Sequence, residues 1–321
     1  MKSSIVIPAF NAADYIVETI VSLLQENGDD YEIILVDDGS TDNTKEVVAP
    51  YLNDRVRYIY QANSGGPAKP RNTGIANSTG ELIFLFDADD IALPGKMQAS
   101  VALLDQHPDA GMLFTNFNVV DQGGTITEHK YLDKYITLNK LLEYELGDNA
   151  FKLNPVDCFA GLFKSNFIGT QGVVIRRSVF DKVGLFDESM RNLDDLDMWI
   201  RVAKEYPLIY VNTPYFNYRN NPLGISKQRL QDQAWERIQI ADKFIGREGN
   251  SKTIEQLLKE FKAVNYLKIA YINVDELFDS SLARKTFFKS FMLKPSFKAF
   301  KGFVKALSGD KALSLYKRYI R

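Results

Sequence analysis

The chain has 321 residues, of which 45% are hydrophobic and 25% are charged, a composition typical of a globular protein with one large domain or about two. A net charge of −2 argues against a nucleic-acid-binding protein, and the single cysteine, Cys158, excludes an internal disulfide and a cysteine-based zinc site. No apolar run approaches the roughly 18–20 residues of a membrane-spanning helix, and the N-terminus lacks the apolar core of a signal peptide, so we expect a cytoplasmic protein.

The N-terminal part of the chain alternates short apolar runs with amphipathic segments, which is the pattern of βαβ units in a parallel sheet. A strand over 4–7, ended by Pro8, precedes a helix to about residue 25, which Asn11 or Asp14 is expected to cap. Further strands are predicted over 32–36, 55–60, 82–86 and 111–115, with helices that begin after Ser40 or Thr41, after Pro67 and at Pro94. The sequence therefore predicts an α/β fold with a mostly parallel central sheet flanked by helices.

Periodicity weakens between residues 121 and 167, where only a hairpin turn at Gly123-Gly124 and a helix over 139–146 are indicated. A long stretch without a clear period is typical of a functional loop or a lid. Regular patterns then predict a strand over 172–175, helices over 176–183 and 194–203, and a last strand over 208–211. From residue 222 onward the pattern is helical, so we expect a catalytic domain over 1–221 and a helical C-terminal extension over 222–321.

The strand over 82–86 ends in three carboxylates, Asp87, Asp89 and Asp90. Carboxylates this close repel one another unless a cation lies between them, and open α/β sheets bind their ligands at the carboxyl ends of the strands. Such hard oxygen ligands suit Mg²⁺ or Mn²⁺, which would bind an anionic ligand in turn. In the alternative interpretation, Asp89 or Asp90 only caps the next helix, and an Asp-x-Asp motif alone does not decide between the two.

Two further acidic pairs occur in comparable positions. Asp37-Asp38 follows the second strand, and Asp194-Asp195 opens the helix before the last strand, where an acid can simply complement the helix dipole. There is no glycine-rich phosphate loop, because Pro8-Ala-Phe-Asn11 stands where a dinucleotide-binding protein has Gly-x-Gly-x-x-Gly. This α/β domain would therefore bind a nucleotide through a metal and side chains.

The chain carries an ordered set of short motifs. They are Ile5-Val-Ile-Pro8-Ala-Phe10-Asn11, Val36-Asp37-Asp38-Gly39-Ser40-Thr41-Asp42, Asn63-x-Gly65, Arg71-Asn72-x-Gly74, Asp87-Ala88-Asp89-Asp90, Phe186-Asp187-Glu188, Asp194-Asp195-x-Asp197-x-Trp199-x-Arg201 and Tyr218-Arg219. Each motif alone is weak, but the ordered set spans about residues 3–219 and is highly specific. In this order the chain resembles a family 2 glycosyltransferase with the GT-A fold, which favours a metal role for the Asp87 and Asp89 motif over a helix cap.

The resemblance implies an inverting transfer of a sugar from a nucleotide-sugar, expected to be UDP-linked, to an acceptor hydroxyl. It implies that Asp38 and the end of the Pro8 strand hold the nucleobase. Arg71 would lie against the nucleotide, and Asp87 would contact the ribose and the sugar. The other donor-binding residues that the matching motifs imply are Phe10, Asn11, Asn63, Gly65, Ala88 and, near the diphosphate, Arg219.

The same resemblance assigns Asp89 to the metal and Asp195 to the general base. A divalent cation stabilises the charge of a diphosphate leaving group, and a carboxylate that accepts the proton of the acceptor hydroxyl contributes roughly 10²–10⁴-fold. One base on the face opposite the leaving group gives inversion, without the second carboxylate that most glycosidases need. The family motif is commonly Glu-Asp, and here it is Asp194-Asp195. This difference leaves open which of the two acids reaches the acceptor. Asp197, two residues further along the helix, should point away from the acceptor.

The segment 284–321 holds eleven Lys and Arg residues and one acid, a net charge of +10 in a protein whose total is −2. Apolar residues recur among them at helical spacing, which is typical of helices that lie on an anionic membrane, where each Lys or Arg contributes about 1 kcal/mol. The alternative is an amphipathic tail that packs on the catalytic domain and exposes a basic face. No groove-reading or stacking motif indicates nucleic-acid binding.

We therefore expect a metal-dependent inverting glycosyltransferase of cell-surface polysaccharide, capsule or lipopolysaccharide synthesis, peripheral on the inner face of the membrane, with a saccharide or lipid-linked saccharide acceptor. One alternative is a catalytically silent sugar-nucleotide-binding or membrane scaffold protein, against which the intact Asp89 and Asp195 argue. Another is a nucleotidyltransferase, which would normally carry a glycine- and lysine-rich N-terminal loop that is absent here. No motif identifies the donor sugar or the acceptor.

Overall fold

The computed structural model describes residues 2–26, 30–220, 230–307 and 309. The chain divides into two compact units, Met1–Gly224 and Ile225–Arg321. The domain boundary predicted from the sequence, between residues 221 and 222, lies outside the described residues. Within the described ranges, no helix combines the length and the apolar character that crossing a bilayer requires.

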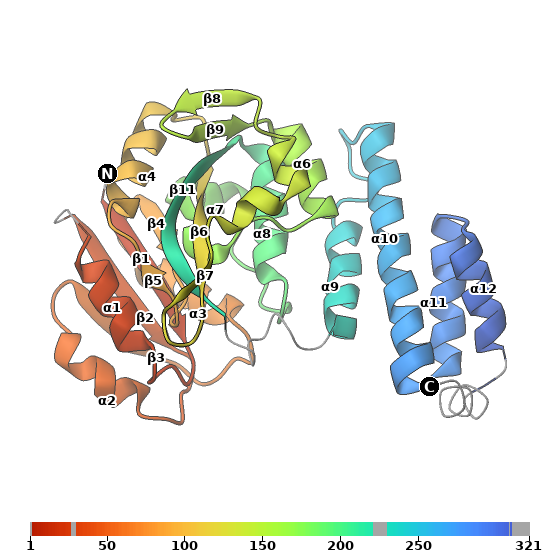
Figure 1. The fold of residues 1–321 in the computed structure, drawn as a ribbon, viewed down its shortest axis with the longest axis horizontal. Coiled ribbons are helices and arrows are strands. Elements are labelled where there is room, and N and C mark those ends of the chain that lie inside the picture. The colour runs from red at the N-terminus through yellow and green to blue at the C-terminus, as the bar shows by residue number, and fades with distance from the viewer. Residues whose placement is uncertain (1, 27–29, 221–229, 308, 310–321) are drawn as a thin grey trace. The chain divides into compact units, whose positions relative to one another are not determined.

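Among the described residues, the first unit is built on one sheet of eleven strands. The strands are β1 (Ser3–Ala9), β2 (Tyr31–Asp37), β3 (Val56–Tyr60), β4 (Leu82–Leu85), β5 (Ile91–Ala92), β6 (Met112–Val120), β7 (Ile126–Glu128), β8 (Tyr144–Gly147), β9 (Ala150–Leu153), β10 (Val174–Arg176) and β11 (Leu208–Arg219). Their order across the sheet is β3-β2-β1-β4-β10-β6-β11-β9-β8, and β5 pairs with β11 and β7 with β6 (Figure 1).

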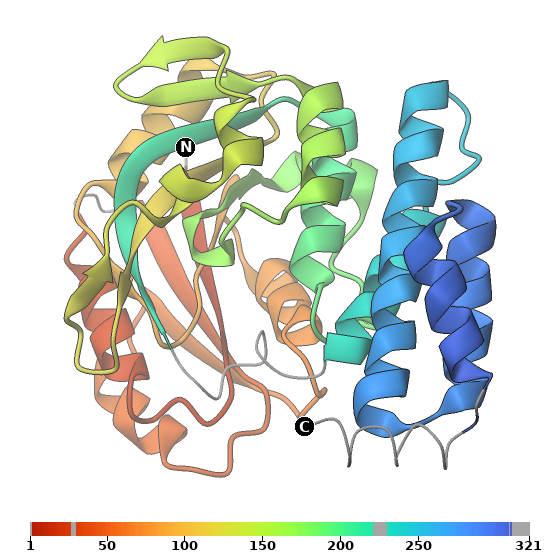
Figure 2. The same cartoon turned by 45° about the vertical axis from the view of Figure 1, so that its right-hand side comes forward.

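Helices flank this sheet in both views (Figures 1 and 2). They are α1 (Ile16–Leu24), α2 (Thr44–Val48), α3 (Ala68–Asn77), α4 (Lys96–Gln106), α5 (Ile136–Asn139), α6 (Pro155–Lys164), α7 (Arg177–Val183) and α8 (Asp194–Glu205), with short 3₁₀ turns at Ala49–Tyr51, Tyr131–Lys134 and Thr170–Gly172. Most of them follow strands, as expected for βαβ units. The predicted α/β fold is therefore confirmed.

The core of the sheet is formed by the apolar runs that the sequence showed. Ile5 on β1 lies opposite Ile33 on β2 and Phe84 on β4, and all three side chains are buried. Pairing is parallel from β3 to β4 and again between β6 and β11, while β10 is antiparallel to both of its neighbours. The sheet is thus mixed and not mostly parallel as the sequence predicted, because β5, β7, β8, β9 and β10 pair antiparallel with their neighbours. Its parallel N-terminal half directs the ends of β1, β2 and β4 to one edge.

Pro8 does not end the first strand, because β1 continues to Ala9. The N–H of Phe86 donates to the Val6 carbonyl, so Val6 faces β4, and Pro8, two residues later, faces the same way. The β1–β4 ladder ends at Val6 and Leu85. The missing N–H of proline therefore falls where no further ladder bond is made.

The helix starts that the sequence predicted for α1 and α2 are also wrong. Helix α1 begins at Ile16, and no side chain caps it. Asn11 instead has a left-handed backbone with φ of 49° and bonds to the loop after β2. Helix α2 begins only at Thr44, whose N–H donates to Asp42 at 3.1 Å, so neither Ser40 nor Thr41 caps it.

The stretch 121–167 contains strands and helices, where the sequence predicted a long irregular segment. The hairpin turn at Gly123-Gly124 is confirmed between β6 and β7, but the helix expected over 139–146 is wrong because β8 occupies part of that range. Helix α6 was missed although its start is signalled by Asn154, whose side chain accepts the N–H groups of Val156 and Asp157. The elements here are short, and too few residues repeat for a period to show.

The second unit is helical, as predicted. It contains α9 (Leu230–Asp242), α10 (Lys252–Ile272), a π-helical turn at Asn273–Leu277, α11 (Ser280–Leu293) and α12 (Phe297–Ala306) (Figure 2). Helix α11 lies against α12, with Ala283, Phe287 and Ala306 in one buried cluster. The basic segment 284–321 is described as far as residue 307 and at 309, and its remaining residues lie outside the described part of the chain.

Candidate active site

The loops after β1 and β2 are joined by hydrogen bonds. The Asn11 side chain accepts the N–H of Thr41 at 2.8 Å, and the N–H of Asn11 donates to the Ser40 hydroxyl at 2.9 Å. The positive φ of Asn11 suits asparagine, which tolerates this conformation better than most residues. Phe10 projects beside it with 52% of its surface exposed, an aromatic face at the end of a central strand.

Asp38 organises the neighbouring loop. Its buried carboxylate accepts hydrogen bonds from the Gln61 amide at 2.6 Å and from the Ser64 N–H at 3.0 Å and hydroxyl at 2.8 Å. A Cβ atom on Gly39 would lie 2.7 Å from the Asn63 nitrogen, so glycine is required for this close approach. The structure thus brings the predicted Asp38, Asn63 and Gly65 into one loop cluster, and it adds Gln61 and Ser64, which the sequence did not single out.

Arg71 connects the strand ends to the helix that carries the predicted base. From α3, its guanidinium donates to Asp87, after β4, at 3.0 Å and to Asp194, in the first turn of α8, at 2.7 Å. Arg71 and Asp194 are both buried, and Asp87 is partly exposed. A buried guanidinium between two carboxylates fixes the distance between their elements, since losing either partner would leave a charge uncompensated.

The other oxygen of Asp87 accepts the Gln171 side-chain amide at 2.6 Å. The backbone carbonyl of Gln171 accepts a hydrogen bond from the buried ammonium of Lys96, which lies 4.6 Å from the centre of the Phe86 ring. Burial lowers the pKa of Lys96 to about 7. Neither Gln171 nor Lys96 belongs to a motif, and each is recognised only by its contacts in space.

Asp89 and Asp90 do not cap the next helix. The N–H groups of Gly95 and Lys96 at the start of α4 donate instead to Glu26, at 3.2 and 3.1 Å. Asp90 is fully buried and accepts the N–H of Arg219 at 2.7 Å, and its pKa is raised by burial and by the neighbouring carboxylates. Burial and then the charge of Asp87 raise the pKa of Asp89, which remains partly exposed, to about 6.

Arg219 is buried among internal partners. Its guanidinium donates to the backbone carbonyls of Asp89 at 3.0 Å and Gln122 at 2.6 Å, and to the Glu18 carboxylate at 2.6 Å. The neighbouring residue Ala88 is also held by an internal contact, because its carbonyl accepts a hydrogen bond from the Thr19 hydroxyl at 3.0 Å. Arg219 therefore fixes the loop after β4, and direct contact with a diphosphate stays a prediction.

The first turn of α8 separates its three acids. Asp194 is bound to Arg71, and Asp197 is buried and paired with Arg201 at 2.8 Å, which confirms that it points away. Asp195 is partly exposed, and the Asn166 amide donates to its carboxylate at 3.3 Å. Burial and then the nearby charge of Asp194 raise the pKa of Asp195 to about 6.

Helix α8 is held against the turn at 184–188. Trp199 is fully buried and meets the Phe186 ring edge-on, with ring centres 6.2 Å apart. Arg201 donates to the Leu185 carbonyl at 2.9 Å, and Asn72 of α3 donates to the Phe186 carbonyl at 2.9 Å. These contacts set the position of Asp195 through the backbone of α8.

Within the described residues, no three His, Cys, Asp or Glu side chains lie close enough to form a metal site by themselves. A Mg²⁺ or Mn²⁺ ion commonly takes one or two carboxylates and completes its shell with water and substrate phosphates. Asp89 fits such a site, because it is a hard oxygen ligand at the end of a central strand. No Lys or Arg in the described part of the chain forms an ion pair with its carboxylate.

The sequence of the chain is similar to those of known glycosyltransferases. The family model described as "Glycosyl transferase family 2" matches residues 4–183. The chain is 27% identical over 278 residues to "Glycosyltransferase GlyG" of Streptococcus pneumoniae serotype 4, covering 84% of this chain and 85% of that protein. It is 27% identical over 237 residues to "Putative teichuronic acid biosynthesis glycosyltransferase TuaG" of Bacillus subtilis, covering 72% and 85%. An uncharacterized glycosyltransferase of Rickettsia felis is longer, and the chain covers 32% of it.

The solved structure of Staphylococcus aureus TarS 1–349 in complex with UDP-GlcNAc has the same fold. The TM-score is 0.69 at 17% identity, over 99% of this chain and 92% of that one. At this identity the likeness shows the fold alone, whereas the family match extends over more than half of the chain. The chain therefore belongs to glycosyl transferase family 2, and it is a glycosyltransferase.

Proposed function

We propose that the protein transfers a sugar from a UDP-linked donor to an acceptor hydroxyl with inversion at the anomeric carbon. One observation carries this proposal, the Arg71 bridge between Asp87 and Asp194. It joins the edge where open α/β sheets bind ligands to the helix turn that presents Asp195. A carboxylate with a raised pKa, partly open to solvent and beside this edge, suits a general base.

The donor nucleotide would lie over the ends of β1 and β2. Phe10 offers an exposed ring for a base, and the cluster of Asp38, Asn63 and Gly65 offers polar groups around it. Asp87, held by Arg71 and Gln171, would face the ribose and the sugar. A uridine donor is supported by TarS, a protein of the same fold that has been solved with UDP-GlcNAc.

In the chemical step, Asp195 accepts the proton of the acceptor hydroxyl. The acceptor oxygen forms a bond to the anomeric carbon while the bond from that carbon to the diphosphate oxygen breaks, and its electron pair leaves with the nucleoside diphosphate. Attack from the face opposite the leaving group inverts the configuration. A single base suffices for this displacement.

Asp89 would hold a divalent cation, Mn²⁺ or Mg²⁺. When bound, the cation supplies Lewis-acid stabilisation of the negative charge on the departing diphosphate, an effect of several kcal/mol. The protein's own contribution is to keep Asp89 in place, which it does by bonding its carbonyl to Arg219 and burying the neighbouring Asp90.

The acceptor would be a saccharide, free or lipid-linked, in the synthesis of a cell-surface polysaccharide at the cytoplasmic face of the membrane. The name of the relative TuaG supports this setting, since it refers to teichuronic acid biosynthesis. The basic helical segment after residue 284 supports a reaction close to anionic lipid.

Donor turnover is the direct test. The protein is incubated with a panel of nucleotide-sugars, with Mn²⁺, with Mg²⁺ or with EDTA, and release of nucleoside diphosphate is followed. We expect metal-dependent release from one donor and a loss of roughly 10²–10⁴-fold in Asp195→Asn. Asp89→Asn should raise the metal concentration that half-saturates activity, and NMR of the product should show an inverted anomeric centre.

Asp105→Asn on α4 and Asp181→Asn on α7 are matched controls, because both side chains are exposed and lie outside the proposed site. Both should keep full activity. If no nucleotide-sugar binds with or without metal, the transferase proposal fails and the silent scaffold alternative takes its place.

A further inference from the structure

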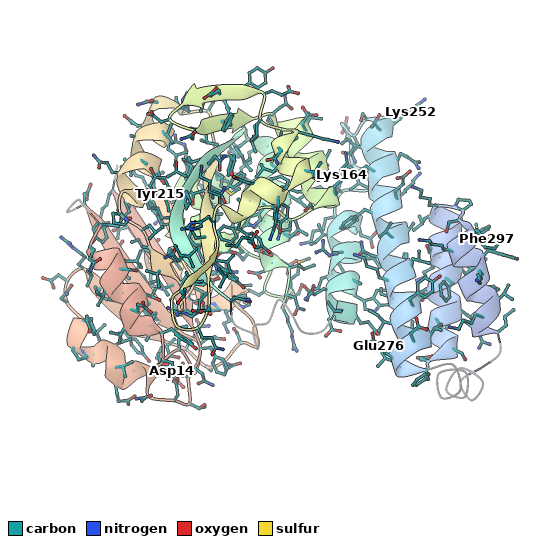
Figure 3. The ribbon with its side chains drawn as sticks, viewed as in Figure 1. Asp14, Lys164, Tyr215, Lys252, Glu276 and Phe297 are labelled. Carbon is teal, nitrogen blue, oxygen red and sulfur yellow. The ribbon has the colours of Figure 1, made fainter. Side chains whose placement is uncertain are left out.

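Helices α11 and α12 expose an unusual set of large apolar side chains. Phe297 is 77% exposed and Met292 is 65% exposed, and the start of α12 at Phe297 is labelled in Figure 3. We call the set the apolar ridge, and its members are Phe288, Met292, Phe297, Phe300, Val304 and Leu307. Single exposed apolar residues are normal on a protein surface, but a contiguous group marks a contact site.

The spacing places the α12 members on one face. Residues 297, 300, 304 and 307 follow one another at intervals of three, four and three, which is one side of an α-helix. The opposite side carries the small residues Ala299, Gly302 and Ala306, all buried. Helix α12 therefore has two apolar faces, one of small residues packed on α11 and one of large residues left exposed.

Aromatic contacts join the two helices into one surface. The ring of Phe288 on α11 lies 6.5 Å from that of Phe303 on α12, and the ring of Phe291 lies 6.5 Å from that of Phe300. Each contact pairs an exposed ring with a partly buried ring of the other helix, so these contacts bring the apolar side chains of α11 and α12 together. The ridge is a surface of two helices and not one stray side chain.

The segment that carries the ridge has charged residues of one sign only. Residues 284–309 contain seven Lys and Arg and no acid. Lys298, Lys301 and Lys305 recur at intervals of three and four, so they form a strip beside the apolar face of α12. Two of the seven are paired, Lys294 with Glu260 and Lys305 with Asp275. Within the described ranges, the other five form no ion pair, and they are Arg284, Lys285, Lys289, Lys298 and Lys301.

We propose that the apolar ridge and its basic strip are the membrane-docking surface of the protein, and that the occupant is a bilayer containing anionic lipid. Large apolar side chains beside lysines are what an interfacial helix needs, since the rings enter the acyl boundary and the ammonium groups meet the headgroups. This inference concerns the second unit and stands independently of the proposed catalytic residues.

A second copy of the chain fits this surface poorly. Two such faces would each bring the five basic side chains of residues 284–309 that form no ion pair among the described residues, so pairing them would oppose like charges. Nucleic acid would use the lysines but leave the apolar ridge in water. An anionic bilayer satisfies both parts of the surface at once.

Vesicle flotation of the full chain tests the proposal. We expect the protein to float with vesicles of phosphatidylcholine and phosphatidylglycerol and not with phosphatidylcholine alone. Lys298→Gln/Lys301→Gln should weaken partitioning by roughly fivefold for each lysine. Phe297→Ser/Phe300→Ser should weaken it by at least about tenfold. The fluorescence of Phe300→Trp should shift to the blue on vesicles, because the indole leaves water.

Matched controls carry the same changes on the first unit. Lys45→Gln/Lys164→Gln removes two exposed lysines, and Ile136→Ser/Val156→Ser removes two exposed apolar side chains. Both should float like the wild type, and all variants should keep soluble donor turnover and the wild-type melting temperature. The proposal would be overturned if the control variants lost as much vesicle binding as the ridge and lysine variants, or if the wild type bound neutral and anionic vesicles equally. It would also be overturned if ultracentrifugation showed a dimer that Phe297→Ser/Phe300→Ser abolishes.

Discussion

The two units of the chain treat charged side chains in opposite ways. At the strand ends of the first unit, several charged groups have internal partners, as Arg71 has in Asp87 and Asp194, and Asp38 has in Ser64. In the second unit, residues 284–309 contain seven basic residues, and among the described residues five of these form no ion pair. The contacts in the first unit fix the positions of the strand ends and of helix α8. The basic side chains of the second unit that form no ion pair remain able to bind an external anionic partner.

Burial explains the contrast. A buried charge needs a bonded partner, because an uncompensated one costs several kcal/mol, whereas an exposed lysine is solvated at little cost. Buried charges with bonded partners therefore mark the places where the relative positions of structural elements are fixed. Unpartnered charges of one sign mark where binding depends on net charge and on salt.

The largest effect should come from removing a partner in the first unit. Arg71→Met leaves Asp87 and the buried Asp194 without their cation, so we expect the free energy of unfolding to fall by about 3–5 kcal/mol. Denaturant unfolding measures this. Adding Asp194→Asn to Arg71→Met should restore part of the loss, because the second change removes the uncompensated charge.

Arg57→Met is the matched control for this prediction. Arg57 pairs with Glu32 at 3.1 Å, but its side chain is 41% exposed, so the loss should stay below about 1 kcal/mol. If the two variants were equally destabilised, burial would not be the cause of the contrast between the units.

A smaller effect should be confined to the second unit. A Cβ atom on Gly302 would lie 2.2 Å from the fully buried Phe287 ring, so Gly302→Ala should destabilise the α11–α12 contact by about 1–3 kcal/mol. Donor turnover in solution should not change. Unfolding followed by circular dichroism, together with the turnover assay, separates the two outcomes.

Phe287→Leu in the Gly302→Ala background should recover part of that stability by making room for the methyl group. Ser281→Ala, an exposed position on α11, should change the unfolding free energy by less than about 0.5 kcal/mol. A Gly302→Ala variant as stable as the wild type would mean that the helices do not pack this closely.

The smallest effect concerns the base itself. Asn166 donates to the Asp195 carboxylate and so stabilises its anion, which lowers the pKa of Asp195. Burial and the charge of Asp194 outweigh this effect and raise that pKa to about 6. Removing the donor in Asn166→Ala should raise that pKa further. Because the base must be unprotonated, the acidic limb of the pH profile of kcat should move to higher pH, by less than about one pH unit. The profile is measured between about pH 5 and about pH 8.

Asn43→Ala is the control, because Asn43 is exposed and its side chain caps nothing. Its pH profile should match that of the wild type. A uniform loss of kcat at every pH in Asn166→Ala would assign Asn166 to substrate positioning instead, and a limb that moves to lower pH would contradict the assignment of Asp195 as the base.

The sequence predicted the part of the fold that depends on apolar runs. The strands around Ile33 and Phe84 are buried on both faces, so their residues are continuously apolar and easily recognised. The antiparallel direction of β10 could not be predicted, because strand direction leaves no mark in composition. The short β8 and α6 were missed for lack of length, although Asn154 and the following proline were a readable start signal.

The candidate site was predicted where it is carried by motifs and missed where it is carried by contacts. Asp38, Asp87 and Asp195 stand in recognisable sequence patterns. Gln171 lies 84 positions from the Asp87 that it bonds, and Asn166 lies 29 positions from Asp195. A single amide in an irregular segment has no pattern, so only the folded chain identifies these partners.

The position of β11 has a consequence for synthesis of the protein. Among the strands that the structure describes it comes last in sequence, yet it lies inside the sheet between β6 and β9, and its final residue, Arg219, holds the backbone of Asp89. A nascent chain therefore cannot complete the middle of its sheet until residue 219 has left the ribosome. Because the helical unit follows, the first unit can finish folding while the second is still being translated.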